Sequence, residues 1–177
     1  MKHLKTFEKS VSEYKNPESI FMKAIEDNDI KKVVEFLKSN IIDINKDIIY
    51  NRGHNNPLWT AINLGRIEIV KELIKYGADV NFKPYSACPL ILLAAYNIPL
   101  HRKVLKADEM PGSEAMLILK ELIKAGADWC IENEHGDTFF DCLDNNSKKE
   151  IIKEFPEKYE RYEKEMTFRR DIKKYNL

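Results

Sequence analysis

The sequence predicts an all-α protein built from stacked copies of one helical unit, and three observations lead to this fold class. The stretch IEIVKELIKYGAD at residues 67–79 recurs almost unchanged as MLILKELIKAGAD at residues 116–128. In both copies the apolar residues fall at helical spacing, so each helix has one face that must be buried. Each helix runs into a glycine, Gly77 or Gly126, where a left-handed backbone costs other residues roughly 1 kcal/mol. Such a short helix cannot form a core alone, so the copies are expected to stack.

The residues upstream of the first copy supply the other half of the unit. The segment from Asn56 to Gly65 contains a proline suited to a first helical turn, then an apolar run and a closing glycine. With Pro57-Leu58 at its start and Gly77-Ala78-Asp79-Val80-Asn81 at its end, the whole stretch resembles an ankyrin repeat. The resemblance implies an all-α ankyrin-repeat solenoid of about four stacked helix-turn-helix repeats, with capping helices at both ends.

The chain is expected to form one ankyrin-repeat domain over residues 1–177. In the first repeat the proline-leucine signature is missing, so this repeat rests on periodicity, with Asn28 and Asn40 at the positions of the later glycines. Asparagine suits those positions because it tolerates the left-handed conformation better than most residues. The expected boundaries are an N-terminal cap at 1–17, repeats at 18–55, 56–83, 84–132 and 133–155, and a C-terminal helix with a tail at 156–177.

Four segments admit two interpretations each. The N-terminal segment either caps the first repeat or docks into a groove of a partner. The apolar run Ile48-Ile49-Tyr50 either packs under its turn or is exposed to a partner. The interval between Gly77 and Gly126 exceeds the usual period of about 33 residues, which predicts an insertion at 98–112, either a functional loop or a solvated one. Trp129 is either a core residue or an interface residue.

The fourth repeat is expected to begin with a turn and a first helix at residues 133–140. Its second helix is predicted to start at Ser147, because Ser147-Lys148-Lys149-Glu150 fits a capping box. Pro156 then ends or kinks that helix. Tyr159, Tyr162 and Met166 give the C-terminal helix an apolar edge, and residues 167–177 are expected to be a basic tail that frays.

Charge, hydropathy and cysteine content exclude several classes of function. Lysine plus arginine and aspartate plus glutamate both number 29, so the net charge is zero and no basic field for nucleic acid is expected. The sequence has no apolar run of about 20 residues and no apolar stretch near its start, which predicts a cytoplasmic protein, or one acting in a host cell if it is a secreted effector. Cys88, Cys130 and Cys142 lack metal-ligand spacing and are expected to stay reduced.

The sequence carries no pattern typical of a catalytic site. The histidines lack metal-ligand spacing, and no glycine-rich phosphate loop or nucleophile elbow is present. Cys130 or Cys142 could imitate a nucleophile with His135 as base, but the histidine is expected at an exposed turn tip. Asp79 and Asp128 are expected to bond local backbone N–H groups. We therefore expect no enzyme, no cofactor and no metal.

The resemblance implies that the concave face and the turn tips bind another protein. The chain is expected to be a monomer when free, without a membrane or nucleic-acid partner. The main hypothesis is a small adaptor or effector module; the alternatives are an immunity or antitoxin-type inhibitor that occludes a toxic enzyme, and a self-associating structural module. Carrying over the contact positions of the family gives these partner-binding residues: Arg52, His54, Asn55, Asn63, Leu64, Tyr76, Lys83, Tyr85, Tyr96, Glu132, Glu134, His135 and Asp137.

Overall fold

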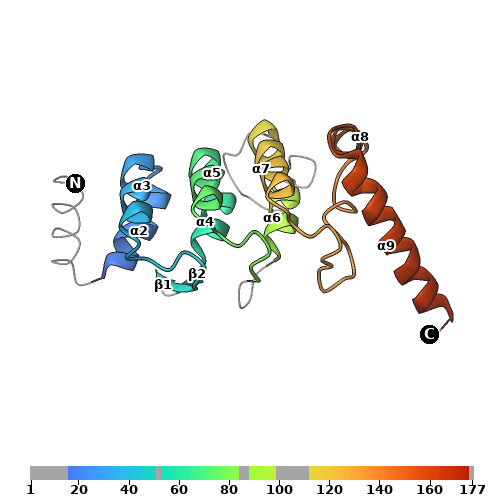
Figure 1. The fold of residues 1–177 in the computed structure, drawn as a ribbon, viewed down its shortest axis with the longest axis horizontal. Helices are drawn as coiled ribbons and strands as arrows, with labels where there is room; N and C mark the ends of the chain where they lie inside the picture. The colour runs from blue at the N-terminus through green and yellow to red at the C-terminus, as the bar shows by residue number, and fades with distance from the viewer. Residues whose placement is uncertain (1–15, 51–52, 84–87, 99–111, 176–177) are drawn as a thin grey trace.

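The computed structural model describes residues 16–50, 53–83, 88–98 and 112–175. The predicted N-terminal cap up to residue 15 and the insertion from 99 to 111 lie outside the described residues. So do Arg52 and Tyr85, as well as the side chains of His54 and Asn55. The described elements form antiparallel helix pairs that stand side by side in one row (Figure 1).

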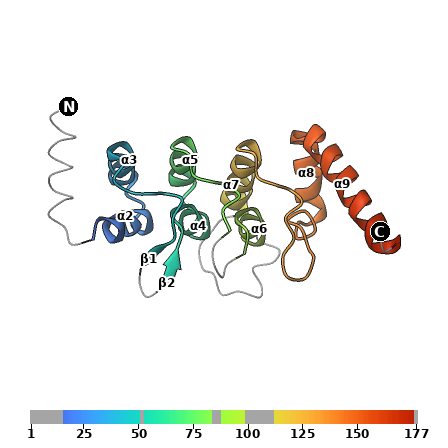
Figure 2. The ribbon, with the colours of Figure 1, turned by 60° about the horizontal axis from the view of Figure 1, so that its bottom comes forward.

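Three helix pairs make up the body of the stack. They are α2 (Pro17–Glu26) with α3 (Ile30–Ser39), α4 (Pro57–Asn63) with α5 (Ile67–Lys75), and α6 (Leu90–Tyr96) with α7 (Gly112–Lys124). The first helices α2, α4 and α6 contact one another in order, and so do the second helices α3, α5 and α7. Two further helices, α8 (Asn145–Glu154) and α9 (Pro156–Tyr175), follow at the C-terminal end (Figure 2). The predicted all-α repeat fold is confirmed.

The helix ends follow the predicted backbone chemistry. Gly77 has φ +89° and Gly126 has φ +94°, so both lie in the left-handed region. Asn28 (φ +57°) and Asn40 (φ +53°) adopt the same conformation in the first repeat. These residues end their helices because the left-handed step turns the chain away from the helix axis.

The repeated helices bury the face that their spacing predicts. Leu73 in α5 and its counterpart Leu122 in α7 are fully buried, whereas Ile67 and Ile74 are only partly buried at the border of that face. Trp129 is 6% exposed, and its ring lies edge-on against Phe139, with 5.1 Å between the ring centroids. Trp129 is therefore a core residue. Trp59 is only half-buried against the core.

Asparagine side chains join successive turns of the stack. The Asn45 amide donates to the carbonyl of Gly77 (3.0 Å) and accepts from the backbone N–H of Asp79 (2.8 Å). One repeat later, Asn81 makes the same pair of bonds to Gly126 (3.3 Å) and Asp128 (2.8 Å). As predicted, the carboxylates of Asp79 and Asp128 also accept from local backbone N–H groups. The turns are thus tied to one another as well as to their own helices.

The turn before α4 contains a short hairpin that the sequence did not predict. Strand β1 (Ile48–Tyr50) pairs antiparallel with β2 (Gly53–Asn55), with Ile49 opposite His54. Ile48 is buried and the Tyr50 hydroxyl donates to Glu26 Oε2 (2.8 Å), but Ile49 is 68% exposed. Ile48 therefore packs under the turn, as the first interpretation predicts, whereas Ile49 is exposed and its contact with a partner stays a prediction.

Three predictions near the C-terminal end are wrong. Residues 139–143 form turns instead of a first α-helix. Helix α8 is capped by Asp144 and starts before Ser147, so the predicted capping box does not form. Residues 167–175 continue α9 and are not a frayed tail. At the borders of the predicted insertion, Ile98 is buried and Gly112 is the first residue of α7. Pro156 ends α8, as expected, and begins α9.

Candidate functional site

The loop between α7 and α8 carries an exposed tip, which we call the fourth tip (residues 132–137). One side chain organises it, because the Asn133 amide oxygen accepts from the backbone N–H groups of His135 (2.8 Å) and Asp137 (2.9 Å). The backbone N–H of Asn133 donates to the carbonyl of Asp137 (2.9 Å), and Gly136 takes the left-handed turn at φ +82°. The tip is fixed by its own hydrogen bonds and lies on the same edge of the stack as the β1–β2 hairpin (Figure 1).

A polar triad holds the base of the fourth tip, and in it Thr138 and Tyr162 are buried while Asp141 is exposed. Thr138 is fully buried, and both its backbone N–H and its hydroxyl donate to Asp141 Oδ2, at 2.9 and 2.7 Å. The Thr138 hydroxyl also lies 2.8 Å from the Tyr162 hydroxyl. Because a threonine hydroxyl has one proton, which goes to Asp141, Tyr162 donates this bond. Helix α9 is thereby linked to the tip.

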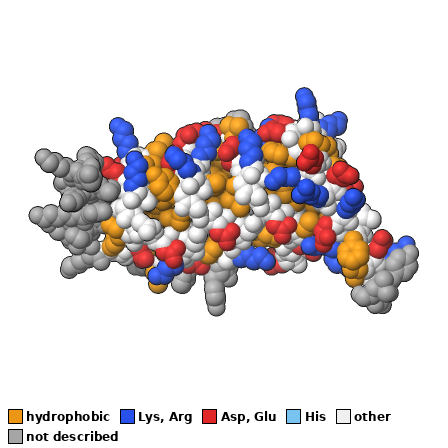
Figure 3. Space-filling model, viewed as in Figure 1, with side chains coloured by type: hydrophobic (Ala, Val, Ile, Leu, Met, Phe, Trp, Pro, Cys, Tyr) orange, Lys and Arg blue, Asp and Glu red, His pale blue; other side chains and the backbone are white. Residues whose placement is uncertain are grey.

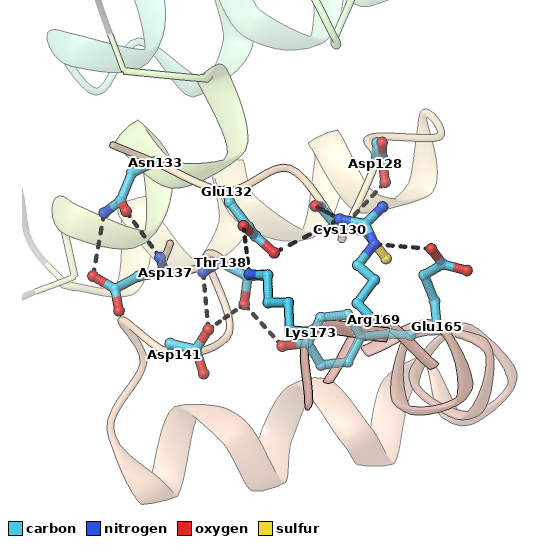
Figure 4. Close-up of polar contacts among 11 residues, drawn as sticks. Asp128, Cys130, Glu132, Asn133, Asp137, Thr138, Asp141, Glu165, Arg169 and Lys173 are labelled. Atoms are coloured by element: carbon cyan, nitrogen blue, oxygen red, sulfur yellow. Dashed lines mark hydrogen bonds and ion pairs between the residues drawn. The ribbon is translucent and has the colours of Figure 1, made fainter. Parts of the chain in front are cut away.

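Helix α9 supports the tip a second time through its basic residues (Figure 4). Arg169 donates to Glu165 Oε1 (2.8 Å) and to the carbonyl of Cys130 (2.9 Å). The Arg169 guanidinium lies 3.7 Å from Glu132 Oε1, and Lys173 lies 3.8 Å from the other oxygen of the same carboxylate. Glu132, predicted as a partner contact, is therefore already engaged within the chain.

The fourth tip forms one wall of a cavity of about 410 Å³, which we call the tip cavity. Its other wall comes from α6 and the residues before it, and the Asn133 side-chain amide donates to the Tyr96 hydroxyl (2.8 Å) across the two walls. Burial raises the pKa of the Cys88 thiol to about 12 and also raises the pKa of Tyr96, so both groups are neutral near pH 7. The cavity is lined by Cys88, Pro89, Tyr96, Glu132, Asn133, Glu134 and His135.

The structure gathers only some of the predicted contact residues. Four of them line the tip cavity, and Asp137 is bonded to the Asn133 amide at its edge (3.3 Å). The four are Tyr96, Glu132, Glu134 and His135.

The other described contact residues lie elsewhere on the stack. Asn63 and Leu64 are exposed at the end of α4, and Lys83 is exposed beyond the second turn. Tyr76 lines a different groove, between the ends of α3 and α5, together with Asn40 and other residues. Tyr76 therefore does not share a surface with the tip cavity.

Sequence reasoning missed the residues that hold the site together. Asn133, Thr138 and Asp141 were not predicted as site residues, although Thr138-Phe139-Phe140-Asp141 is a threonine followed three residues later by an acid, as at a helix N-terminus. That pattern was the available signal for the Thr138–Asp141 pair. Arg169 was placed only in the basic tail, as a residue that is solvated or contacts an acidic surface. No local pattern could indicate that Arg169 supports the tip, because the partners that matter there, Cys130 and Glu132, lie on a different loop.

The outer helices present charges of both signs. Lysine and arginine side chains spread along the upper half of the face in Figure 3, with carboxylates between them. Many are paired within a helix, as Lys71 is with Glu68 at 2.9 Å. Within the described residues, no helix is both long and apolar enough to cross a membrane, and no group of three or more His, Cys, Asp or Glu side chains is placed to hold a metal ion.

Comparison with known proteins finds ankyrin repeats by several routes. A family model described as ankyrin repeats (3 copies) matches residues 2–107. A putative ankyrin repeat protein of Rickettsia bellii is 42% identical over 79 residues, which cover 44% of this chain and 11% of that protein. A putative ankyrin repeat protein of fowlpox virus is 33% identical over 67 residues, which cover 38% of this chain and 15% of that protein.

Two further proteins match over limited parts of their length. A probable palmitoyltransferase of Saccharomyces uvarum is 44% identical over 61 residues, which cover 34% of this chain and 8% of that protein. The chain thus spans a small fraction of the curated relatives it matches. The crystal structure of the ankyrin repeat domain of Bcl-3 matches with a TM-score of 0.56 and 21% identity, over 75% of this chain and 50% of that one.

Proposed function

The chain belongs to the ankyrin-repeat family, and we propose that it is a non-enzymatic module that binds a partner protein through its turn tips and first helices. Ankyrin-repeat domains are generally protein-protein interaction modules. One observation carries the proposal for this chain: the fourth tip presents Glu134, His135 and Asp137 to solvent on a loop that its own hydrogen bonds already order. A partner that binds there immobilises little backbone, so less of the contact energy is lost to ordering.

The chemistry of the described residues supports a binding role over a catalytic one. A nucleophilic cysteine requires a lowered pKa, because the thiolate is the reactive form. Burial instead raises the pKa of Cys88, Cys130 and Cys142. His135 has a side chain that is 75% exposed at the tip, beside Glu134, and no cysteine is its hydrogen-bond partner among the described residues.

Affinity capture from a lysate of the source cells tests the proposal. The tip variant Glu134→Ala/His135→Ala is compared with Glu160→Ala/Asn145→Ala, which changes one exposed carboxylate and one exposed neutral residue on α9 and α8. Both variants should melt like the wild type. The expected result is a captured protein that the wild type and the control retain and the tip variant loses. Equal capture by both variants, or capture by none of the three proteins, would contradict the proposal.

A further inference from the structure

The tip cavity has an apolar wall and an acidic wall. Pro89, the neutral Cys88 thiol and the ring of Tyr96 form the first, on the side of α6. Glu132 and Glu134 line the opposite side, on the fourth tip. A cavity with this division suits a side chain that has an apolar stem and a positively charged end, because each part meets a surface of its own kind.

The two carboxylates of the acidic wall differ in their partners, and Glu134 is the one that helix α9 does not pair. Glu134 has an 87% exposed side chain whose nearest charge partner is the tip histidine, at 3.7 Å. Glu132 is paired from the α9 side with Arg169 and Lys173, at 3.7 and 3.8 Å. Asp137 adds a third carboxylate at the edge. None of the described residues that line the cavity is lysine or arginine, and the two cations of α9 pair with Glu132, so a cation is favoured on the side of Glu134.

We propose that the tip cavity receives an arginine side chain of the partner protein, with its guanidinium on Glu134 and its methylene stem along Pro89 and Tyr96. The inference deepens the proposed function and rests on it. Arginine fits better than lysine because its planar guanidinium can form two parallel bonds to one carboxylate, which the point charge of an ammonium cannot. The tip stays in place when the side chain enters, because Asn133 fixes both the loop and the Tyr96 hydroxyl.

The test uses the blocked amino acid N-acetyl-L-arginine N-methylamide as the probe, titrated into the full-length ¹⁵N-labelled protein. Amide chemical shifts are the readout, and the neutral analogue N-acetyl-L-citrulline N-methylamide is the control ligand. We expect millimolar binding, with shift changes centred on Tyr96 and residues 132–137, and no matching response to the citrulline compound. A ligand of this size forms few contacts, so weak binding is the expected scale.

A charge-matched pair of variants separates the cavity from the rest of the surface. Glu134→Gln should weaken binding of the arginine probe about twofold to tenfold, the range between an exposed ion pair and a charged hydrogen bond. Glu160→Gln removes the same charge from α9 and should leave binding unchanged. The inference is overturned if both variants respond alike, if the citrulline compound shifts the same amides, or if no shift appears at the highest soluble probe concentration.

The outcome is distinguishable from that of the capture experiment. If capture depends on the fourth tip but the arginine probe does not bind there, the proposed function stands and only the arginine inference fails. If the probe binds as expected but no protein is captured, the proposed function fails and the inference about a partner's arginine falls with it.

Discussion

Replacing Gly77 with valine tests the backbone demand on which the whole repeat rests. Gly77 lies at φ +89°, and a Cβ built on it would meet no other atom within 4 Å. The cost of Gly77→Val is therefore conformational and not steric: about 1–2 kcal/mol for holding a residue with a Cβ in the left-handed region. For a chain of 150–250 residues each kcal/mol lowers the melting temperature by about 2–4 °C. We expect a decrease of roughly 2–8 °C.

Thermal unfolding followed by far-ultraviolet circular dichroism measures this decrease, with urea unfolding as an independent measure. Asn40→Gly is the matched control, because Asn40 occupies the same left-handed position at φ +53° with a side chain already present. Asn40→Gly should not lower the melting temperature, since glycine adopts the left-handed conformation without the cost that a Cβ imposes. If Gly77→Val melts within about 1 °C of the wild type, the left-handed stop is not what stabilises the helix end.

Three further predictions concern contacts between repeats and titrating groups. Asn81→Ala removes two hydrogen bonds to the next turn and should destabilise the protein by about 1–2 kcal/mol in urea unfolding, whereas an unchanged midpoint would show that the turns are held by packing alone. Lys120→Met breaks the pairs with Glu150 (2.7 Å) and Glu154 (2.6 Å) and should cost up to about 1 kcal/mol, with a smaller difference from wild type in 1 M NaCl. Folding raises the pKa of the Cys88 thiol from 9.0 to about 12, so the folded chain holds this proton more tightly than the unfolded chain does. The contribution of Cys88 to stability should therefore be constant below pH 9 and should decrease as the pH rises toward 12. A Cys88→Ala variant should lose less stability than the wild type over that range.

Local chemistry made much of the stack predictable. The glycine and asparagine stops follow from backbone preference at a single residue, and Asn40 shows that the preference holds even where the repeat signature is weak. The burial of Leu73 and Leu122 follows from helical spacing alone. These features need no knowledge of the neighbouring repeat.

Competition between nearby signals explains the errors around α8. Asp144 and Ser147 are both good N-cap residues, and they lie three positions apart. Asp144 prevails because its Oδ1 accepts from two backbone N–H groups, at 2.8 and 3.1 Å, while the Ser147 hydroxyl donates to its other oxygen. These contacts lower the pKa of Asp144. A sequence pattern cannot rank two such caps, because the ranking depends on where the preceding chain places each side chain.

The site could not be predicted because its supports come from distant segments. In the turns at Asn45 and Asn81, an asparagine bridges to the next repeat, but the corresponding residue of the third turn is Cys130, whose side chain cannot make both bonds. Arg169 of α9 instead donates to the Cys130 carbonyl and, through Glu132, holds the base of the fourth tip. One substitution in the repeated turn thus removes the bridge between repeats, and helix α9 supplies the support at the same place. Arg169→Met should therefore speed hydrogen exchange at the amides of the fourth tip and leave exchange at the amides of α4 and α5 unchanged. Equal protection of the tip in the variant and the wild type would refute the supporting role of Arg169.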